Sequence, residues 1–304
     1  MIEDLINNKV RPQFTARSIS RNSLIAETID LSNILLKPIL EKIGNKRLAI
    51  IGDGVLRYIP FAALPDPRVG DRYQPLLVNH EVVYLPSAST LQTLRNEAQA
   101  RTPAPKTLAV LGDWDRLPGT RREANTILNL VPESNRLAYF DFPGDRANAL
   151  NNQLSEYRFI HWAIQGFINT ENPELSSMVA CLVDRNGARS NRNLLFTDIF
   201  NLSFNADLVV LSACQTPLEG VGLEEGSIGL IRGVMYAGTP RVVTNLWDVP
   251  DTETATLMGK FYEKMLQQNL RPAEALRAAQ LEMFNSRSWS PFYWAAFTLQ
   301  GEWR

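Results

Sequence analysis

Short apolar runs alternate with amphipathic stretches beyond residue 105. Runs of strand length lie at residues 107–111, 136–140, 159–164 and 208–211 and from residue 241. Apolar residues recur at helical spacing in 120–130, 145–154, 226–235, 252–267 and 272–284, and a closing strand is expected at 292–299. Because strands that alternate with helices form parallel sheets covered on both sides, this pattern predicts an α/β fold. We expect a mainly parallel sheet flanked by helices on both faces.

The first hundred residues carry a looser pattern, which predicts a smaller N-terminal α/β subdomain. Gly52-Asp53-Gly54 separates two short apolar segments and is a turn signal, so we expect these segments to form a hairpin. Pro38 interrupts the first helical stretch. The elements expected here are helices at 31–40 and 89–100 and strands at 47–51, 55–59 and 82–85.

A stiff linker divides the chain. Thr102-Pro103-Ala104-Pro105 cannot continue a helix, so it separates an N-terminal subdomain at 31–101 from a larger subdomain at 106–304. Residues 1 to about 25 are polar, carry scattered arginines and show no clear periodicity. We interpret residues 1–30 as a leader or the end of an upstream region.

The composition argues against two classes of function, nucleic-acid binding and membrane association. The 304 residues have a net charge of −1 with both signs well mixed, which argues against the concentrated basic face of a nucleic-acid-binding protein. There is no apolar stretch of 18 residues, and the N-terminus lacks the features of a signal peptide, so no membrane association is expected. These features favour a cytoplasmic protein.

Cysteine and histidine are scarce. Cys181 and Cys214 are the only cysteines, too few for a disulfide framework, which agrees with a reducing cytoplasm. His80 and His161 are far apart and have no zinc-ligand spacing, so we expect no metal and no cofactor. We interpret both histidines and Cys181 as structural.

One cysteine stands where a nucleophile is commonly presented. The apolar run 208–211 leads into small residues and Cys214, which places a thiol at the end of a buried strand. A second run, 159–164, ends at Gln165, where a base for that thiol is expected. Glutamine has no titratable nitrogen and cannot take the proton. Because ligands bind beyond the carboxyl ends of parallel strands, Gln165, Cys214 and residues 248–251 should share one cleft.

Further motifs lie, in order along the chain, at 166–169, 172–176, 211–216, 225–226 with 229–230, 235–238, 244–251 and 291–297. Together, and in this order, they resemble the motifs of the CHAT family. CHAT domains are caspase-like cysteine peptidases of clan CD, related to separases and often joined to tetratricopeptide repeats. The resemblance runs from about residue 31 to the C-terminus, and it implies a caspase-like fold.

The resemblance also implies catalytic positions. Cys214 matches the family nucleophile, and Gln165 occupies the position of the family histidine. Gly166 and the backbone amide of Cys214 would form the oxyanion hole, since caspase-like enzymes use main-chain donors there. His161 lies four residues upstream of Gln165, about 13 Å along a strand, so it is a core histidine rather than a substitute base.

Substrate-binding positions follow from the same resemblance. Asp251 matches an acidic position that receives an arginine or lysine side chain before the scissile bond. N-capping of the following helix explains Asp251 equally well, and both roles stay open. Asp248 is its neighbour, Trp247 forms a pocket wall or part of the core, and Glu225 adds acidity or lines a helix start.

Three functions remain possible. The one we favour is a pseudo-peptidase, which keeps Cys214 but lacks the histidine at Gln165 and binds peptides or proteins that present arginine or lysine. The second is an active cysteine endopeptidase for basic residues whose base was replaced or lies elsewhere. The third is an interaction scaffold with a vestigial cleft, with a tetratricopeptide-repeat region as a possible partner.

Overall fold

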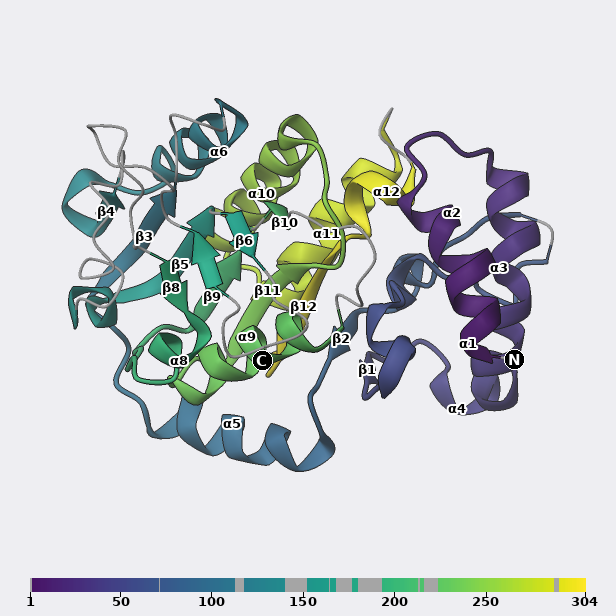
Figure 1. Cartoon of the computed structure of the whole chain (residues 1–304), viewed down its shortest axis with the longest axis horizontal. Coiled ribbons are helices and arrows are strands. Elements are labelled where there is room, and N and C mark those ends of the chain that lie inside the picture. The colour runs from purple at the N-terminus through teal and green to yellow at the C-terminus, as the bar shows by residue number, and fades with distance from the viewer. Residues whose placement is uncertain are drawn as a thin grey trace.

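A computed structural model describes residues 2–70, 72–112, 118–139, 152–163, 165–167, 177–179, 193–212, 214–215, 224–286 and 290–304. Its centre is an eight-stranded sheet with the order β1-β2-β12-β11-β9-β5-β3-β4 (Figure 1). The strands are β1 (Leu48–Ile50), β2 (Val82–Tyr84), β3 (Lys106–Gly112), β4 (Arg136–Tyr139), β5 (Tyr157–Ala163), β9 (Leu208–Leu211), β11 (Arg241–Asn245) and β12 (Phe297–Gly301). The expected α/β fold is confirmed.

The sheet is mainly parallel. Strands β4, β3, β5, β9 and β11 run in one direction, whereas β12 is antiparallel to β11. The N-terminal strands β2 and β1 follow β12 in parallel pairing, so they extend the same sheet rather than form a separate one. The division into residues 31–101 and 106–304 stays a prediction, but a shared sheet joins the two stretches.

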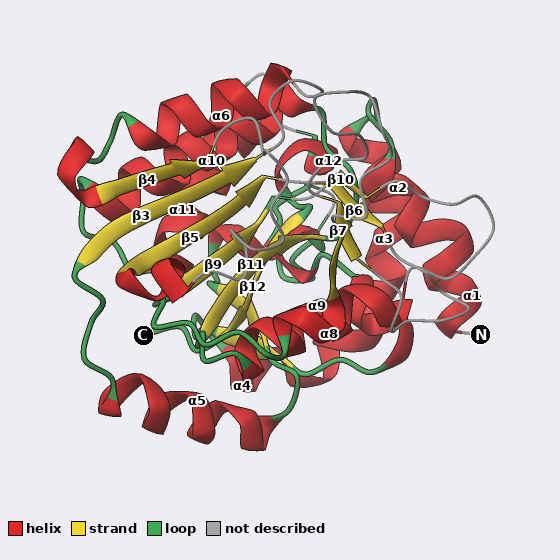
Figure 2. Cartoon of the chain, turned by 60° about the vertical axis from the view of Figure 1, so that its left-hand side comes forward, coloured by secondary structure: helices red, strands yellow, loops and turns green. Residues whose placement is uncertain are grey.

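Helices cover both faces of the sheet (Figure 2). One face packs against α6 (Pro118–Leu128), α10 (Asp251–Leu266) and α11 (Pro272–Phe284), and the other faces α5 (Ala88–Ala100), α8 (Phe196–Ile199) and α9 (Glu224–Tyr236). Successive strand residues alternate between these faces: Leu108 and Val110 point to the first, Ala109 and Leu111 to the second. Because both faces of the sheet are buried, the strands appear in the sequence as continuous apolar runs.

A second, smaller sheet continues from the carboxyl ends of the central strands. Its order is β10-β6-β7-β8. Strand β6 (Gln165–Phe167) follows β5 after one residue, and β10 (Cys214–Gln215) follows β9 after two residues. The remaining strands are β7 (Ser177–Val179) and β8 (Asn193–Leu195).

The hairpin expected at 47–51 and 55–59 is wrong. Residues Gly54–Tyr58 form the 3-10 helix η3, and β1 pairs instead with β2, Leu48 opposite Val82. Gly54 has a φ of 50°, which turns the chain, and the Leu56 amide donates to Asp53 O at 3.2 Å. Local 3-10 bonding at the turn therefore replaces the expected ladder. Residues 61–63 also form a 3-10 helix, η4 (Phe61–Ala63).

The N-terminal residues are helical, so the absence of periodicity assigned to them is wrong. Ile6, Val10 and Phe14 recur every fourth residue, are buried and join the main core. The elements are α1 (Ile2–Leu5), η1 (Ile6–Val10), α2 (Arg11–Thr15), α3 (Arg21–Leu36), η2 (Lys37–Ile39) and α4 (Leu40–Ile43). Assignment of residues 1–30 to an upstream region stays a prediction.

The structure also differs from the sequence prediction at residues 292–299 and at residues 145–154. The strand expected at 292–299 begins later, because Pro291 starts a short helix, α12 (Pro291–Trp294), before β12. The helix expected at 145–154 lies mostly outside the described residues, and Asn152–Glu156 form a 3-10 helix, η7. The helix at 272–284 is confirmed as α11. No helix within the described ranges is both long enough and apolar enough to cross a bilayer.

Replacement of Phe14 tests whether the N-terminal helices contribute to the core. Phe14 is fully buried, so Phe14→Ala should lower the free energy of unfolding by about 3–5 kcal/mol. Ile34 on α3 is 48 % exposed, and Ile34→Ala should cost less than about 1 kcal/mol. Urea denaturation measures both. Equal effects would mean that the N-terminal helices do not pack on the core in solution.

Candidate active site

Two predicted site residues are direct neighbours on adjacent strands. In the parallel pairing of β10 with β6, Cys214 lies opposite Gln165, and Gln215 lies opposite Gly166. Paired strands are about 4.8 Å apart, so the backbone brings the thiol position and the glutamine position together. These strands extend β9 and β5, which are themselves paired, His161 opposite Val210. The register of the buried sheet thus continues into the candidate site.

His161 belongs to the core beneath this pair. It lies four residues before Gln165 on β5, as Val210 lies four before Cys214, which is about 13 Å along a strand. Its side chain is fully buried, with Nδ1 3.2 Å from the Tyr262 hydroxyl and the two rings in an edge-on contact. Burial raises the pKa of Tyr262 well above its usual value. The interpretation of His161 as a core residue is confirmed.

Glu123 links this core to the strand that leads to Cys214. Its carboxylate, 2 % exposed, accepts a hydrogen bond from Ser212 Oγ at 3.0 Å. The same oxygen, Oε1, lies 3.1 Å from His161 Nε2, without the in-line geometry of a hydrogen bond. The Ser212 amide also donates to Trp162 O at 2.8 Å. Both bonds hold the backbone two residues before Cys214.

The sequence carries a signal for a buried role of Glu123, although no motif includes it. Glu123 lies one helical turn before Ile127 on α6, on the stripe that also includes the buried Ala124 and Leu128. A carboxylate on the apolar stripe of a helix requires a buried partner. Ser212, directly after β9, meets that requirement with a hydrogen bond, and His161 on β5 lies beside the same oxygen.

Asp251 lies at the junction of two helices. Helix α10 begins at Asp251 with Pro250 as its N-cap, so the N-capping role for Asp251 is wrong. Its carboxylate lies in the first turn, where negative charge is favourable. A methyl group added to Gly119 at the start of α6 would lie only 1.9 Å from Asp251 Cβ. Because α6 follows β3 and α10 follows β11, this contact spans the ends of β5 and β9, which lie between them.

The other residues singled out in the sequence lie in different environments. Trp247 is partly buried against the main core, and its Nε1–H donates to Phe292 O at 3.0 Å. Asp248 is exposed, and Glu225 lies in the first turn of α9. His80 is buried between Arg68 and Lys46 O, which confirms its structural role. Cys181 lies outside the described residues.

A comparison with family models matches the CHAT domain over residues 27–302. The chain belongs to the CHAT domain family. This CHAT domain is 34 % identical over 113 residues to mouse tetratricopeptide repeat protein 28 and 33 % identical over 113 residues to the human protein. These matches cover 36 % of this chain but only 4 % of each relative, so the chain spans a small part of their length.

Solved structures show the fold of this CHAT domain. Separase in the Saccharomyces cerevisiae separase–securin complex gives a TM-score of 0.54 at 15 % identity, covering 84 % of this chain and 16 % of that one. The Arg-specific cysteine proteinase gingipain R gives 0.58 at 14 % identity, covering 99 % and 74 %. The fold is therefore caspase-like, as expected from the resemblance. Among the described residues of the CHAT domain, no three His, Cys, Asp or Glu side chains cluster as metal ligands.

The close approach of Gly119 to Asp251 predicts strong coupling between the two positions. Gly119→Ala should lower the free energy of unfolding by about 1–3 kcal/mol, because its methyl group overlaps Asp251 Cβ. In an Asp251→Gly background the overlapping atom is gone, and the same change should cost little. A double-mutant cycle of urea unfolding measures the coupling. An equal cost in both backgrounds would contradict the contact.

Glu123 should be needed for stability. Glu123→Ala leaves the Ser212 hydroxyl without its acceptor and removes the carboxylate beside His161, so it should cost about 2–4 kcal/mol of unfolding free energy. Glu123→Gln keeps an acceptor oxygen at the same position, so it should cost less than half as much. Thermal and urea unfolding of both variants test this. Two small and equal losses would show that the network contributes little.

Proposed function

We propose that this CHAT domain is a pseudo-peptidase, which retains the nucleophile position Cys214 but lacks the histidine base. The observation that supports it most is the in-register pairing of Cys214 with Gln165 on neighbouring strands. A general base must lie within hydrogen-bonding reach of the proton it removes. The residue whose backbone is aligned with the cysteine has a side chain that cannot accept that proton.

The chemistry explains why activity should be low. A free cysteine has a pKa of about 8.5, so only a small fraction is thiolate at neutral pH. Loss of a positioned base removes a contribution of about 10²- to 10⁴-fold, and the same group is needed to protonate the leaving amine. The chain contains only two histidines, and both are buried in other contacts.

The binding functions of the cleft do not need that base. Main-chain donors at Gly166 and Cys214 would form the oxyanion hole, and a backbone donor is unaffected by the identity of residue 165. We therefore assign the domain a role in binding an extended peptide, with hydrolysis reduced or absent.

We propose that the bound peptide presents arginine or lysine. Asp251 supports this, since its carboxylate lies beside the start of α6 and flanks the strand ends that carry Cys214 and Gln165. Trp247 would provide an apolar wall, with Asp248 and Glu225 adding negative charge near the mouth. Gingipain R, which shares the fold, is Arg-specific, and that agrees with a basic side chain here.

The cellular context is part of the proposal. The relatives that match are tetratricopeptide repeat proteins, which supports a repeat region, in the same chain or in a partner, as the neighbour of this domain. Separase is solved with a protein partner, securin, which agrees with protein binding by the shared fold. A cytoplasmic location fits two cysteines and no disulfide framework.

Restoring the missing base tests the proposal directly. Fluorogenic peptides that end in arginine or lysine should be cleaved by Gln165→His at least about 100-fold faster than by the unmodified chain. Gln165→His/Cys214→Ala should be inactive, because the thiol is the nucleophile. Gln92→His places a histidine on the exposed α5 and serves as the matched control.

The outcomes separate the alternatives. Hydrolysis by the unmodified chain that is lost in Cys214→Ala would establish an active peptidase with another base. In the absence of hydrolysis, fluorescence anisotropy with an arginine peptide should show binding that weakens in Asp251→Asn. No cleavage by Gln165→His together with no peptide binding would leave the scaffold role.

A further inference from the structure

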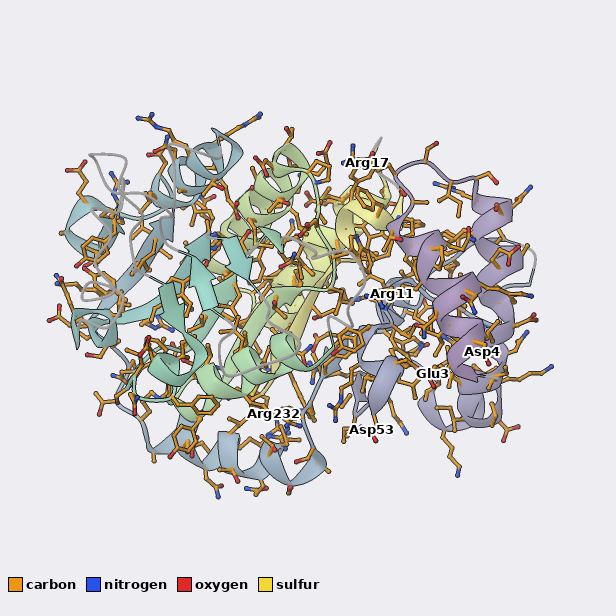
Figure 3. The ribbon with its side chains drawn as sticks, in the orientation of Figure 1. Glu3, Asp4, Arg11, Arg17, Asp53 and Arg232 are labelled. Carbon is orange, nitrogen blue, oxygen red and sulfur yellow. The ribbon has the colours of Figure 1, made fainter. Side chains whose placement is uncertain are left out.

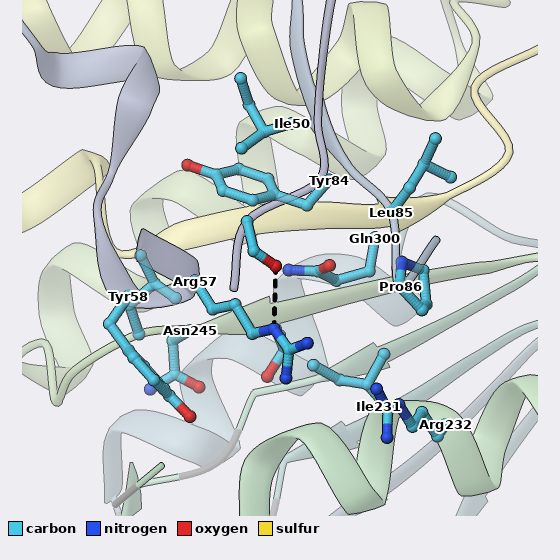
Figure 4. Close-up of a pocket in the computed structure, with 13 residues that line it drawn as sticks. Ile50, Arg57, Tyr58, Tyr84, Leu85, Pro86, Ile231, Arg232, Asn245 and Gln300 are labelled. Carbon is cyan, nitrogen blue, oxygen red and sulfur yellow. Dashed lines mark hydrogen bonds between the residues drawn. The ribbon is translucent and has the colours of Figure 1, made fainter. Parts of the chain in front are cut away.

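A pocket on the α9 face of the sheet is not used by the proposed reaction. It lies over β2, β12 and β11, with α9 on one side and η3 on the other, and no residue of β9 lines it (Figure 4). Its empty space is about 720 Å³, which includes the solvent at its mouth.

Two arginines from distant parts of the chain meet in this pocket. Arg57 Nε–H donates to Gly52 O at 3.0 Å, which holds its guanidinium inside the pocket (Figure 4). Arg57 also pairs with Asp53 at 3.1 Å, but the Asp53 side chain is 97 % exposed and such pairs are weak. Arg232 enters from α9. Its guanidinium makes no hydrogen bond or ion pair with the residues that the structure describes.

The surroundings add positive charge. No aspartate or glutamate is found among the described residues that line the pocket. A third arginine, Arg11, lies 5.8 Å from the ring centre of Tyr58, which forms part of the wall. Figure 3 shows Arg11, Asp53 and Arg232, which come from α2, the turn before η3, and α9. Two cationic groups that share a pocket without a buried counter-charge favour an anion.

The walls are mainly apolar. Leu85, Pro86, Ile231 and Leu246 contribute aliphatic surface. Tyr84 offers only its ring, because its hydroxyl donates to Ile59 O and accepts from the Phe61 amide, each at 2.8 Å. Burial raises the pKa of Tyr84, so it stays neutral. An anion that binds here therefore needs an apolar body.

We propose that this pocket binds the C-terminal carboxylate of a peptide that ends in an aliphatic residue. The carboxylate lies between Arg57 and Arg232, whose planar guanidinium groups each offer paired donors to its two oxygens. The aliphatic side chain packs on Leu85, Ile231 and Leu246. A phosphate ester, which carries about 1.5 to 2 negative charges, is less suited to mainly apolar walls than a singly charged carboxylate.

Titration calorimetry at low ionic strength tests the assignment with acetyl-Gly-Gly-Leu as the probe. The free acid should bind, and the same peptide with a C-terminal amide should bind at least about tenfold more weakly, since it lacks the charge. Arg232→Gln should weaken binding of the acid at least about tenfold and leave the melting temperature unchanged, because Arg232 is exposed. Arg122→Gln, an exposed arginine on α6, is the matched control and should bind normally.

Other outcomes would overturn the proposal. Equal binding of acid and amide would show that the carboxylate is not recognised. Tighter binding of an acetylated glutamate amide would make an acidic side chain the ligand, and competition by inorganic phosphate alone would indicate a phosphate site. Arg57→Lys keeps the charge but loses the forked geometry, so unchanged binding would exclude a paired contact.

This test is independent of the cysteine site. Cys214→Ala should bind the acetylated tripeptide as tightly as the unmodified chain, because the proposed contacts to the carboxylate come from Arg57 and Arg232. The pseudo-peptidase proposal can therefore fail without affecting the pocket, and loss of carboxylate binding would leave the peptide cleft untouched.

Discussion

The structure depends on the register between β5 and β9. These strands lie in the middle of a sheet buried on both faces, where a shift by one residue would exchange the side chains of the two faces. The alternation of Ile160 and Trp162 toward one side and His161 toward the other fixes that register. The extensions β6 and β10 keep the same register. Cys214 and Gln165 are therefore aligned by packing several residues earlier in the strands.

A polar network supports the same strands from the side. Apolar contacts alone tolerate small sliding movements, whereas a buried carboxylate must keep its partners. Glu123 comes from α6 and contacts His161 on β5 and Ser212 directly after β9, so it ties one covering helix to the two central strands. The meeting of Gly119 with Asp251 adds a steric contact between α6 and α10 at the same end of the sheet. The edge that carries the candidate site is thus more constrained than its short strands suggest.

Sequence patterns predicted the parts of the fold that depend on periodicity. Strands buried on both sides produce continuous apolar runs, and α11 matched its prediction from Pro272 to Phe284. Errors arose where local hydrogen bonding outweighs the pattern, as in η3, where an alternating segment folds into a 3-10 helix after Gly54. The N-terminal helices were missed because Ile6, Val10 and Phe14 are separated by polar residues and form only a narrow stripe.

The candidate site shows the same division. Motifs identified Cys214 and Gln165, but the Glu123–Ser212 contact joins residues 89 positions apart and has no local signature. The pocket that contains Arg57 and Arg232 was not predicted from the sequence. These two arginines form a site only because the fold places η3 beside α9. Sequence motifs can therefore find residues with family roles, whereas sites built from unrelated segments require the tertiary structure.

The position of β12 has a consequence for biosynthesis. The last strand in chain order lies between β2 and β11, so the two N-terminal strands reach the sheet only through it. During translation β11 keeps an open edge, and β1 and β2 remain without a partner sheet, until β12 leaves the ribosome. Open edges of this kind promote pairing with other chains. The nascent domain is therefore most exposed to aggregation while β11 has emerged and β12 has not, and this is the interval in which chaperone binding would matter most.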